Sequence, residues 1–132
     1  MIIDSSALIA ILRDEAVAPT LVTVLRDAAT RSISAGTLLE ASIVADGPRD
    51  PVRSSRYDAM LEELDLEVVP VTGSQVRIAR QAYRDFGRGS GHPANLNFGD
   101  CFSYALAAER REPLLYVGED FGHTDIRSAL AS

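Results

Sequence analysis

Four acidic residues stand where a fold could bring them together. Asp4 ends the first apolar run, Glu40 lies inside an apolar stretch, Asp100 follows a glycine-rich segment, and Asp120 follows the last apolar run. Closely packed carboxylates repel one another and raise the pKa values of some members unless a cation neutralises them. Oxygen ligands of this kind suit Mg2+ or Mn2+. The four acids therefore predict a divalent-metal site, provided that the chain gathers them.

Each acid also has an explanation that concerns stability alone. Asp4 could cap the helix that follows it, and Asp100 could stabilise the first turn of its own helix. Glu40 could pair with an arginine, and Asp120 could lie in an exposed turn. The four acids taken together favour a site more strongly than any one of them does.

Short apolar runs alternate with segments of helical spacing, and this alternation predicts the elements that would position the acids. Strands are expected at residues 1–4, 31–35, 66–71 and 114–118, with a fifth at 125–130. Helices are expected at 6–13, 16–30, 36–46, 56–65, 74–86 and 100–111, with a surface loop at 87–99. The pattern predicts an α/β fold with a central, mainly parallel sheet of four to five strands and helices on both faces. Functional side chains of such sheets gather beyond the carboxyl ends of the strands.

Length and composition limit the class of protein. The 132 residues suit a single domain spanning 1–132. The first apolar run is too short to cross a bilayer, and the lone Cys101 fits a reducing compartment, so a cytoplasmic location is expected. The net charge of −6 argues against a conventional sequence-reading nucleic-acid protein. All 13 basic side chains are arginines, which suit bidentate contacts with phosphate or carboxylate.

Four segments, in order, resemble the PIN-domain family and more narrowly the VapC-type toxins, the ribonuclease half of bacterial toxin–antitoxin pairs. The segments are IIDSSALIAIL, TLLEAS, NFGDCFSYALA and YVGEDFGHTDI, and the similarity covers nearly the whole chain. The resemblance implies a Rossmann-like PIN domain whose acidic pocket binds Mg2+, or Mn2+, and cuts RNA. It implies that the catalytic and metal-binding quartet is Asp4, Glu40, Asp100 and Asp120. Ser6 matches the hydroxyl residue that helps to order the site, whereas Glu119 departs from many relatives and its part is left open.

The resemblance further implies a VapB-type antitoxin that blocks the pocket, a toxin homodimer and a toxin–antitoxin hetero-oligomer. Because an acidic pocket repels RNA, arginines elsewhere must hold the RNA backbone. Spacing places four arginines on one face of a helix, where they are candidates for contact with RNA or the antitoxin: Arg77, Arg80, Arg84 and Arg88. An ordinary solvated face is the alternative interpretation.

The predicted reaction is hydrolysis of RNA phosphodiester bonds by metal-activated water, which leaves a 5′-phosphate and a 3′-hydroxyl. The main competing function is a catalytically inactive PIN-like domain that binds RNA or protein. A receiver-type phosphoacceptor domain is disfavoured because its site uses a lysine, and this chain contains none. The amphipathic helices expected near the start of the chain are consistent with a groove for a partner.

Overall fold

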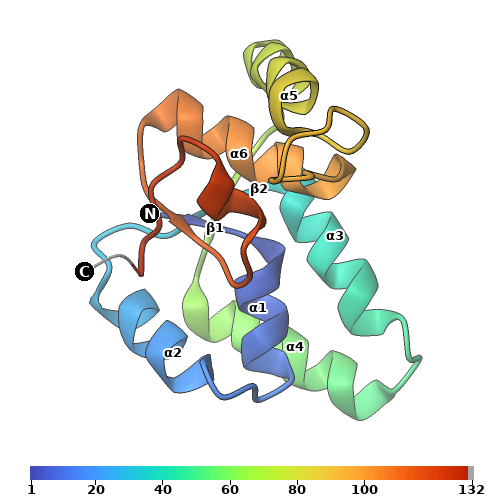
Figure 1. Ribbon diagram of the computed structural model, residues 1–132. Helices are drawn as coiled ribbons and strands as arrows, with labels where there is room; N and C mark the ends of the chain where they lie inside the picture. The colour runs from blue at the N-terminus through green and yellow to red at the C-terminus, as the bar shows by residue number, and fades with distance from the viewer. Residues whose placement is uncertain (131–132) are drawn as a thin grey trace.

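The computed structural model describes residues 1–130, in which short strands alternate with longer helices (Figure 1). The elements in chain order are β1 (Ile2–Ile3), α1 (Ser5–Leu12), α2 (Ala18–Asp27), β2 (Ser32–Ser34), α3 (Ala35–Asp46), α4 (Pro51–Leu64), β3 (Glu67–Val69), α5 (Gly73–Phe86), α6 (Phe98–Arg110), β4 (Leu114–Leu115) and the 3-10 helix η1 (Asp120–His123). Within this described part, no helix is long and apolar enough to cross a membrane.

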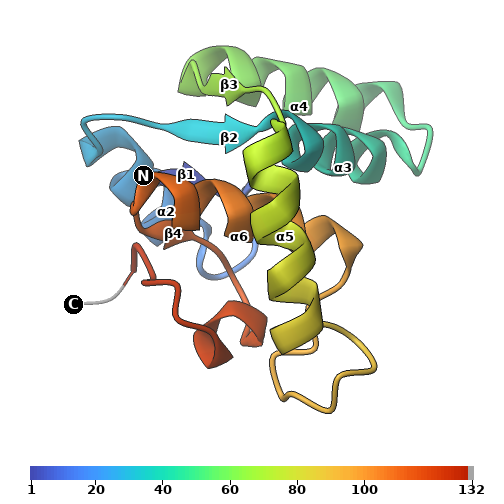
Figure 2. The ribbon, with the colours of Figure 1, turned by 90° about the horizontal axis from the view of Figure 1, so that it is seen from above.

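The four strands form one parallel sheet in the order β3-β2-β1-β4, which Figure 2 shows from above. Ile2 of β1 pairs with Ser32 of β2 on one side and with Leu114 of β4 on the other. The first and last strands are therefore neighbours, and the predicted α/β fold with a parallel sheet is confirmed.

The fifth strand predicted at residues 125–130 does not form. Ser128 makes only an isolated bridge with Leu114. Two backbone hydrogen bonds flank Ser128: Leu114 N donates to Arg127 O, and Ala129 N donates to Leu114 O. Because β4 is only two residues long, it offers no ladder that the tail could continue.

Helices cover both faces of the sheet, as the alternation of side chains along β1 requires. Ile3 packs into a core with α1, α2 and α4, whereas Ile2 packs into a second core with α5 and α6. Figure 1 shows these two groups of helices on opposite sides of β1 and β2. Both isoleucines are fully buried, so the strand is held from above and below.

Helices α4 and α6 begin two or more residues earlier than the spacing of apolar residues predicts, because their caps lie outside the apolar pattern. α4 begins at Pro51, which occupies the first turn, while the side chain of Asp50 accepts a hydrogen bond from Val52 N. α6 begins at Phe98 because Asn97 starts a capping box, described below with the site.

Candidate active site at the carboxyl ends of the strands

Asp4 follows β1 directly and is only 2% exposed. Its Oδ2 accepts hydrogen bonds from Ser6 N at 3.0 Å and Ser6 Oγ at 2.6 Å, and its Oδ1 accepts one from Ser103 Oγ at 2.5 Å. The bond from Ser6 N makes Asp4 the N-cap of α1, so the capping role foreseen for it is real. The same carboxylate also stands at the strand end, where parallel sheets place functional groups.

Ser6 links the end of the central strand β1 to the end of the edge strand β4. Its hydroxyl donates to Asp4 and accepts a hydrogen bond from Val117 N, just beyond β4, at 3.0 Å. Nearby, Asp4 N donates to Leu115 O at 2.9 Å. The Ser6 hydroxyl therefore contacts both Asp4 and the chain after β4, a position consistent with the site-ordering role that the resemblance implies.

Glu40 lies half-buried on α3, where its Oε1 accepts a hydrogen bond from Ser5 Oγ at 2.7 Å. Its carboxylate packs against the start of α6 at Gly99. A Cβ at that position would lie 1.7 Å from Glu40 Oε2, so only glycine leaves room for the carboxylate as it is placed. None of the ion pairs in residues 1–130 includes Glu40, so the alternative of an arginine partner does not apply.

Asp100 is the acid whose pKa responds to the charges of the other three. Burial is the main reason that the pKa of Asp100 is raised from 3.8 to about 6. A hydrogen bond from the Asn97 backbone opposes the rise, and the charges of Asp4, Asp120 and Glu40 contribute to it in that order. The hydrogen bond belongs to the capping box, in which Asn97 N donates to Asp100 Oδ2 at 3.0 Å and Asp100 N donates to Asn97 Oδ1 at 2.9 Å. Asp100 therefore caps α6 and also carries the repulsion of three other carboxylates.

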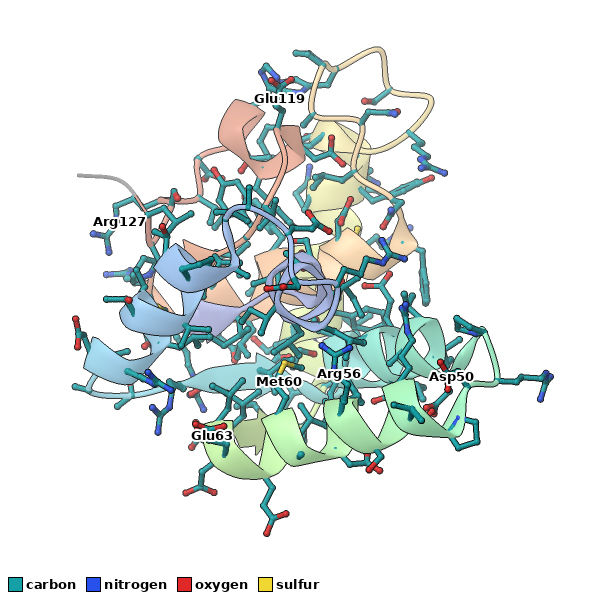
Figure 3. The ribbon with its side chains drawn as sticks, turned by 90° about the horizontal axis from the view of Figure 1, so that it is seen from below. Asp50, Arg56, Met60, Glu63, Glu119 and Arg127 are labelled. Atoms are coloured by element: carbon teal, nitrogen blue, oxygen red, sulfur yellow. The ribbon has the colours of Figure 1, made fainter. Side chains whose placement is uncertain are left out.

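Asp120 begins η1 and is exposed, unlike Asp4. Phe121, the next residue, is buried and packs against Tyr116 with ring centroids 5.2 Å apart. This contact anchors η1 beside the end of β4 and holds Asp120 within electrostatic reach of Asp100. Glu119 is also exposed, on the outer side of η1 (Figure 3), and its side chain does not cap the short helix.

The donor chemistry of these acids fits a divalent cation, although their placement does not yet surround one. No arginine forms an ion pair with Asp4, Glu40, Asp100 or Asp120 in the described chain, so their mutual repulsion is not compensated there. Among residues 1–130, no three side chains of His, Cys, Asp and Glu are arranged to hold a common ion. Shared binding of one ion would therefore require these side chains to adopt positions other than those they occupy in the structure.

Two buried hydroxyl residues complete the surroundings of Asp4, and the sequence interpretation missed both. Ser103 and Thr37 are fully buried, and their hydroxyl oxygens lie 3.0 Å apart. Ser103 follows Asp100 by three residues on α6, so the two share a helix face. That spacing was the available signal for Ser103, whereas nothing local singles out Thr37 on α3.

The prediction of four arginines on one helix face is wrong for Arg88. α5 ends at Phe86, and a Cβ at Gly87 would lie 2.3 Å from Tyr83 O, so the chain leaves the helical path before Arg88. Arg88 N instead donates to Leu96 O at 2.9 Å.

The other three arginines are exposed on α5, as the spacing predicts. Arg80 and Arg84 line an apolar groove of about 620 Å³ between α5 and α6, together with Tyr83 and Phe98. Their contacts with RNA or with an antitoxin, and those of Arg77, stay predictions.

The remaining nucleophilic or titratable groups near the site have structural roles. Burial and the charge of Asp100 raise the pKa of the Cys101 thiol to about 11, so the thiol is not a ready nucleophile. His92 Nδ1 accepts a hydrogen bond from Ala94 N at 3.1 Å, and its ring packs edge-on against Phe86. Neither group therefore competes with the carboxylates as the candidate for chemistry at this site.

The chain is similar to known proteins over nearly its whole length. The PIN domain family matches residues 1–127. Ribonuclease VapC28 of Mycobacterium tuberculosis is 58% identical over 130 residues, which cover 98% of each chain. Ribonuclease VapC of Mycolicibacterium smegmatis is 42% identical over 126 residues, covering 96% of this chain and 97% of that protein.

Solved structures share the fold at much lower identity. The crystal structure of M. tuberculosis VapC20, described as a toxin that cleaves the sarcin-ricin loop, matches with a TM-score of 0.72 and 16% identity over 95% of both chains. A toxin–antitoxin complex from Klebsiella pneumoniae matches with a TM-score of 0.71 and 15% identity, covering 97% of this chain and 96% of that one. These matches bear on the arrangement of helices and strands alone.

Proposed function

Because the chain belongs to the PIN-domain family, and within it to the VapC ribonucleases, we propose that it is the toxin of a VapBC-type pair, a Mg2+-dependent endoribonuclease. One observation carries the proposal. Asp4 is buried and held by hydroxyl groups at the end of β1, close enough to Asp100 to help raise its pKa to about 6. Unneutralised carboxylates at the carboxyl edge of a parallel sheet are the chemistry expected of an oxygen-ligand cation site.

The chain's own residues would contribute position and charge. Asp4 and Asp100 are our main candidates for ion ligands, with Glu40 and Asp120 beside them. A bound Mg2+ or Mn2+ would lower the pKa of water and stabilise the charge that develops on the phosphate oxygens. Ser6 would keep the Asp4 carboxylate oriented, since it holds Oδ2 and is itself held by Val117 N. Hydrolysis by water would leave a 5′-phosphate and a 3′-hydroxyl on the cut RNA.

RNA cleavage by single-carboxylate variants tests the proposal. Asp4→Ala and Asp100→Ala should abolish cleavage, as should removal of the cation with EDTA. Asp50→Ala is the matched control, because Asp50 is exposed and caps α4 away from the acidic site. Activity that survives both site substitutions would indicate a contaminating nuclease and favour the alternative of an inactive PIN-like binding domain. Products with a 2′,3′-cyclic phosphate would refute hydrolysis by metal-activated water.

We also propose that the antitoxin docks in a groove of about 380 Å³ between α1, α2 and α4. Its apolar floor includes Leu12 and Met60, and its rim carries Arg26, Arg56 and Glu63. Figure 3 shows Arg56, Met60 and Glu63 along α4. Apolar contacts flanked by arginines suit an amphipathic peptide that carries acidic side chains. A Met60→Glu variant should lose antitoxin binding and keep RNA cleavage; retained binding would exclude this groove.

A homodimer and a cytoplasmic location, where RNA is available, complete the proposal. Exposed apolar side chains gather around the α5–α6 groove, among them Val76 at 54% and Phe98 at 78% exposure. Contiguous exposed apolar surface of this kind commonly marks a protein interface. Sedimentation of Val76→Asp should show a shift from dimer to monomer; a wild-type chain that is already monomeric would refute the homodimer.

A further inference from the structure

We propose that Ser103 and Thr37 form a hydroxyl relay that positions the Asp4 carboxylate for cation binding; this inference rests on the proposed function. Neither residue touches the expected ion or the RNA in this role, so both are positioning residues. The relay joins three elements: Thr37 on α3, Ser103 on α6 and Asp4 at the end of β1.

Proton counting gives the relay its direction. An ionised carboxylate can only accept hydrogen bonds, so the single hydroxyl proton of Ser103 is used in the bond to Asp4 Oδ1 at 2.5 Å. The contact of 3.0 Å between Ser103 Oγ and Thr37 Oγ1 must then be donated by Thr37. Successive donors polarise one another, which strengthens the final bond to the carboxylate.

A second relay reaches the same carboxylate at its other oxygen. Val117 N donates to Ser6 Oγ, and Ser6 Oγ donates to Asp4 Oδ2. The two relays donate hydrogen bonds to both oxygens of Asp4 and thereby fix the plane of the carboxylate. Oδ2 accepts two hydrogen bonds and Oδ1 accepts one, so Oδ1, the oxygen that Ser103 holds, keeps the greater capacity to accept a cation.

Packing alone does not explain a hydroxyl at position 103. The residues that follow it on α6, from Tyr104 to Ala107, are buried and mostly apolar, so alanine would suit the helix and the core. A buried hydroxyl carries a desolvation cost that only its hydrogen bonds offset. Here those bonds go to Asp4 and Thr37, which ties the choice of serine to the carboxylate.

Mn2+ binding to the full chain tests the relay without relying on catalysis. The variants are Ser103→Ala, which removes the direct donor, Thr37→Val, which removes the outer donor, and Thr37→Ser, which restores it. Ser42→Ala is the matched control, because the Ser42 hydroxyl on α3 bonds to Leu38 O and Tyr57 OH instead. Titration calorimetry or the electron paramagnetic resonance of free Mn2+ gives the affinity, and melting temperatures report folding.

Ser103→Ala should weaken Mn2+ binding by about 10- to 100-fold, the range typical when a residue that supports a metal ligand is lost. Thr37→Val should cause a smaller loss, while Thr37→Ser and Ser42→Ala should bind like the wild type. In RNA cleavage, Ser103→Ala should lower kcat and leave KM unchanged.

Wild-type affinity in both Ser103→Ala and Thr37→Val would overturn the relay while leaving the proposed function intact. If Ser103→Ala does not fold, the comparison of Thr37→Val with Thr37→Ser decides the matter, and equal affinities there overturn the relay. If Asp4→Ala binds Mn2+ as tightly as the wild type does, both the relay and the proposed metal site are refuted.

Discussion

Replacing Asp100 with asparagine should stabilise the cation-free protein at neutral and alkaline pH. The folded carboxyl takes up a proton as the pH falls through about 6, whereas the unfolded chain does so near 3.8. Between these values the folded state binds more protons, so the ionised carboxyl lowers the free energy of unfolding above about pH 6, and this penalty vanishes below pH 3.8.

The size of the effect follows from the raised pKa. A rise from 3.8 to about 6 corresponds to about 3 kcal/mol as an upper limit. Partial solvent exposure reduces this figure, and loss of a charge in the first turn of α6 costs about 0.3–1 kcal/mol. Asparagine can still accept the hydrogen bond from Asn97 N. We therefore expect Asp100→Asn to gain about 1–2 kcal/mol at about pH 8 and almost nothing at about pH 4.

Urea unfolding in EDTA measures this difference at the two pH values. Asp50→Asn is the control for loss of charge at a helix start, because Asp50 is an exposed cap. It should be neutral or slightly destabilising at both pH values. An Asp100→Asn protein that is no more stable than the wild type at the higher pH would refute the idea that uncompensated repulsion is concentrated at Asp100.

Two further substitutions probe the packing around the site. Gly99→Ala places a Cβ 1.7 Å from Glu40 Oε2. Because the Glu40 side chain can move away from this Cβ, RNA cleavage should fall at least tenfold (about 1.4 kcal/mol) while the melting temperature changes little. The control Gly47→Ala, where a Cβ would lie 3.4 Å from its nearest atoms, should leave cleavage unchanged. Equal cleavage by both variants would show that the position of Glu40 is unimportant. In denaturant titrations, Leu8→Ala should lower the free energy of unfolding by about 2–5 kcal/mol, because Leu8 is fully buried. The control Val52→Ala, at a position 69% exposed, should have little effect. Similar losses of unfolding free energy in the two variants would contradict the assignment of the core.

The sequence predicted the site best where a residue follows a strand. Asp4 and Asp120 each come after a short apolar run, and the pairing of β1 with β4 brings those strand ends together. Parallel order is a strong constraint, because crossovers place the carboxyl ends of the strands at one edge. The catalytic roles of these acids stay predictions until variants are assayed.

The sequence predicted less where a contact depends on the packing of distant helices. Thr37 approaches Ser103 only because α3 lies against α6, and no local spacing records that contact. Arg88 was misplaced because the arginine spacing was extended beyond residue 86, where the helix was predicted to end and where α5 does end. The tail near Ser128 resembles a strand in composition, yet the two residues of β4 leave it little to pair with.

The position of β1 in the middle of the sheet has a consequence for synthesis on the ribosome. β1 is translated before both of its neighbours in the sheet, and one of them, β4, begins only at Leu114. Until residues 114–117 emerge, Asp4 N lacks its acceptor Leu115 O and Ser6 lacks its donor Val117 N. A nascent or prematurely terminated chain that stops before β4 would thus lack both contacts, and the surroundings of the Asp4 carboxylate would be incomplete.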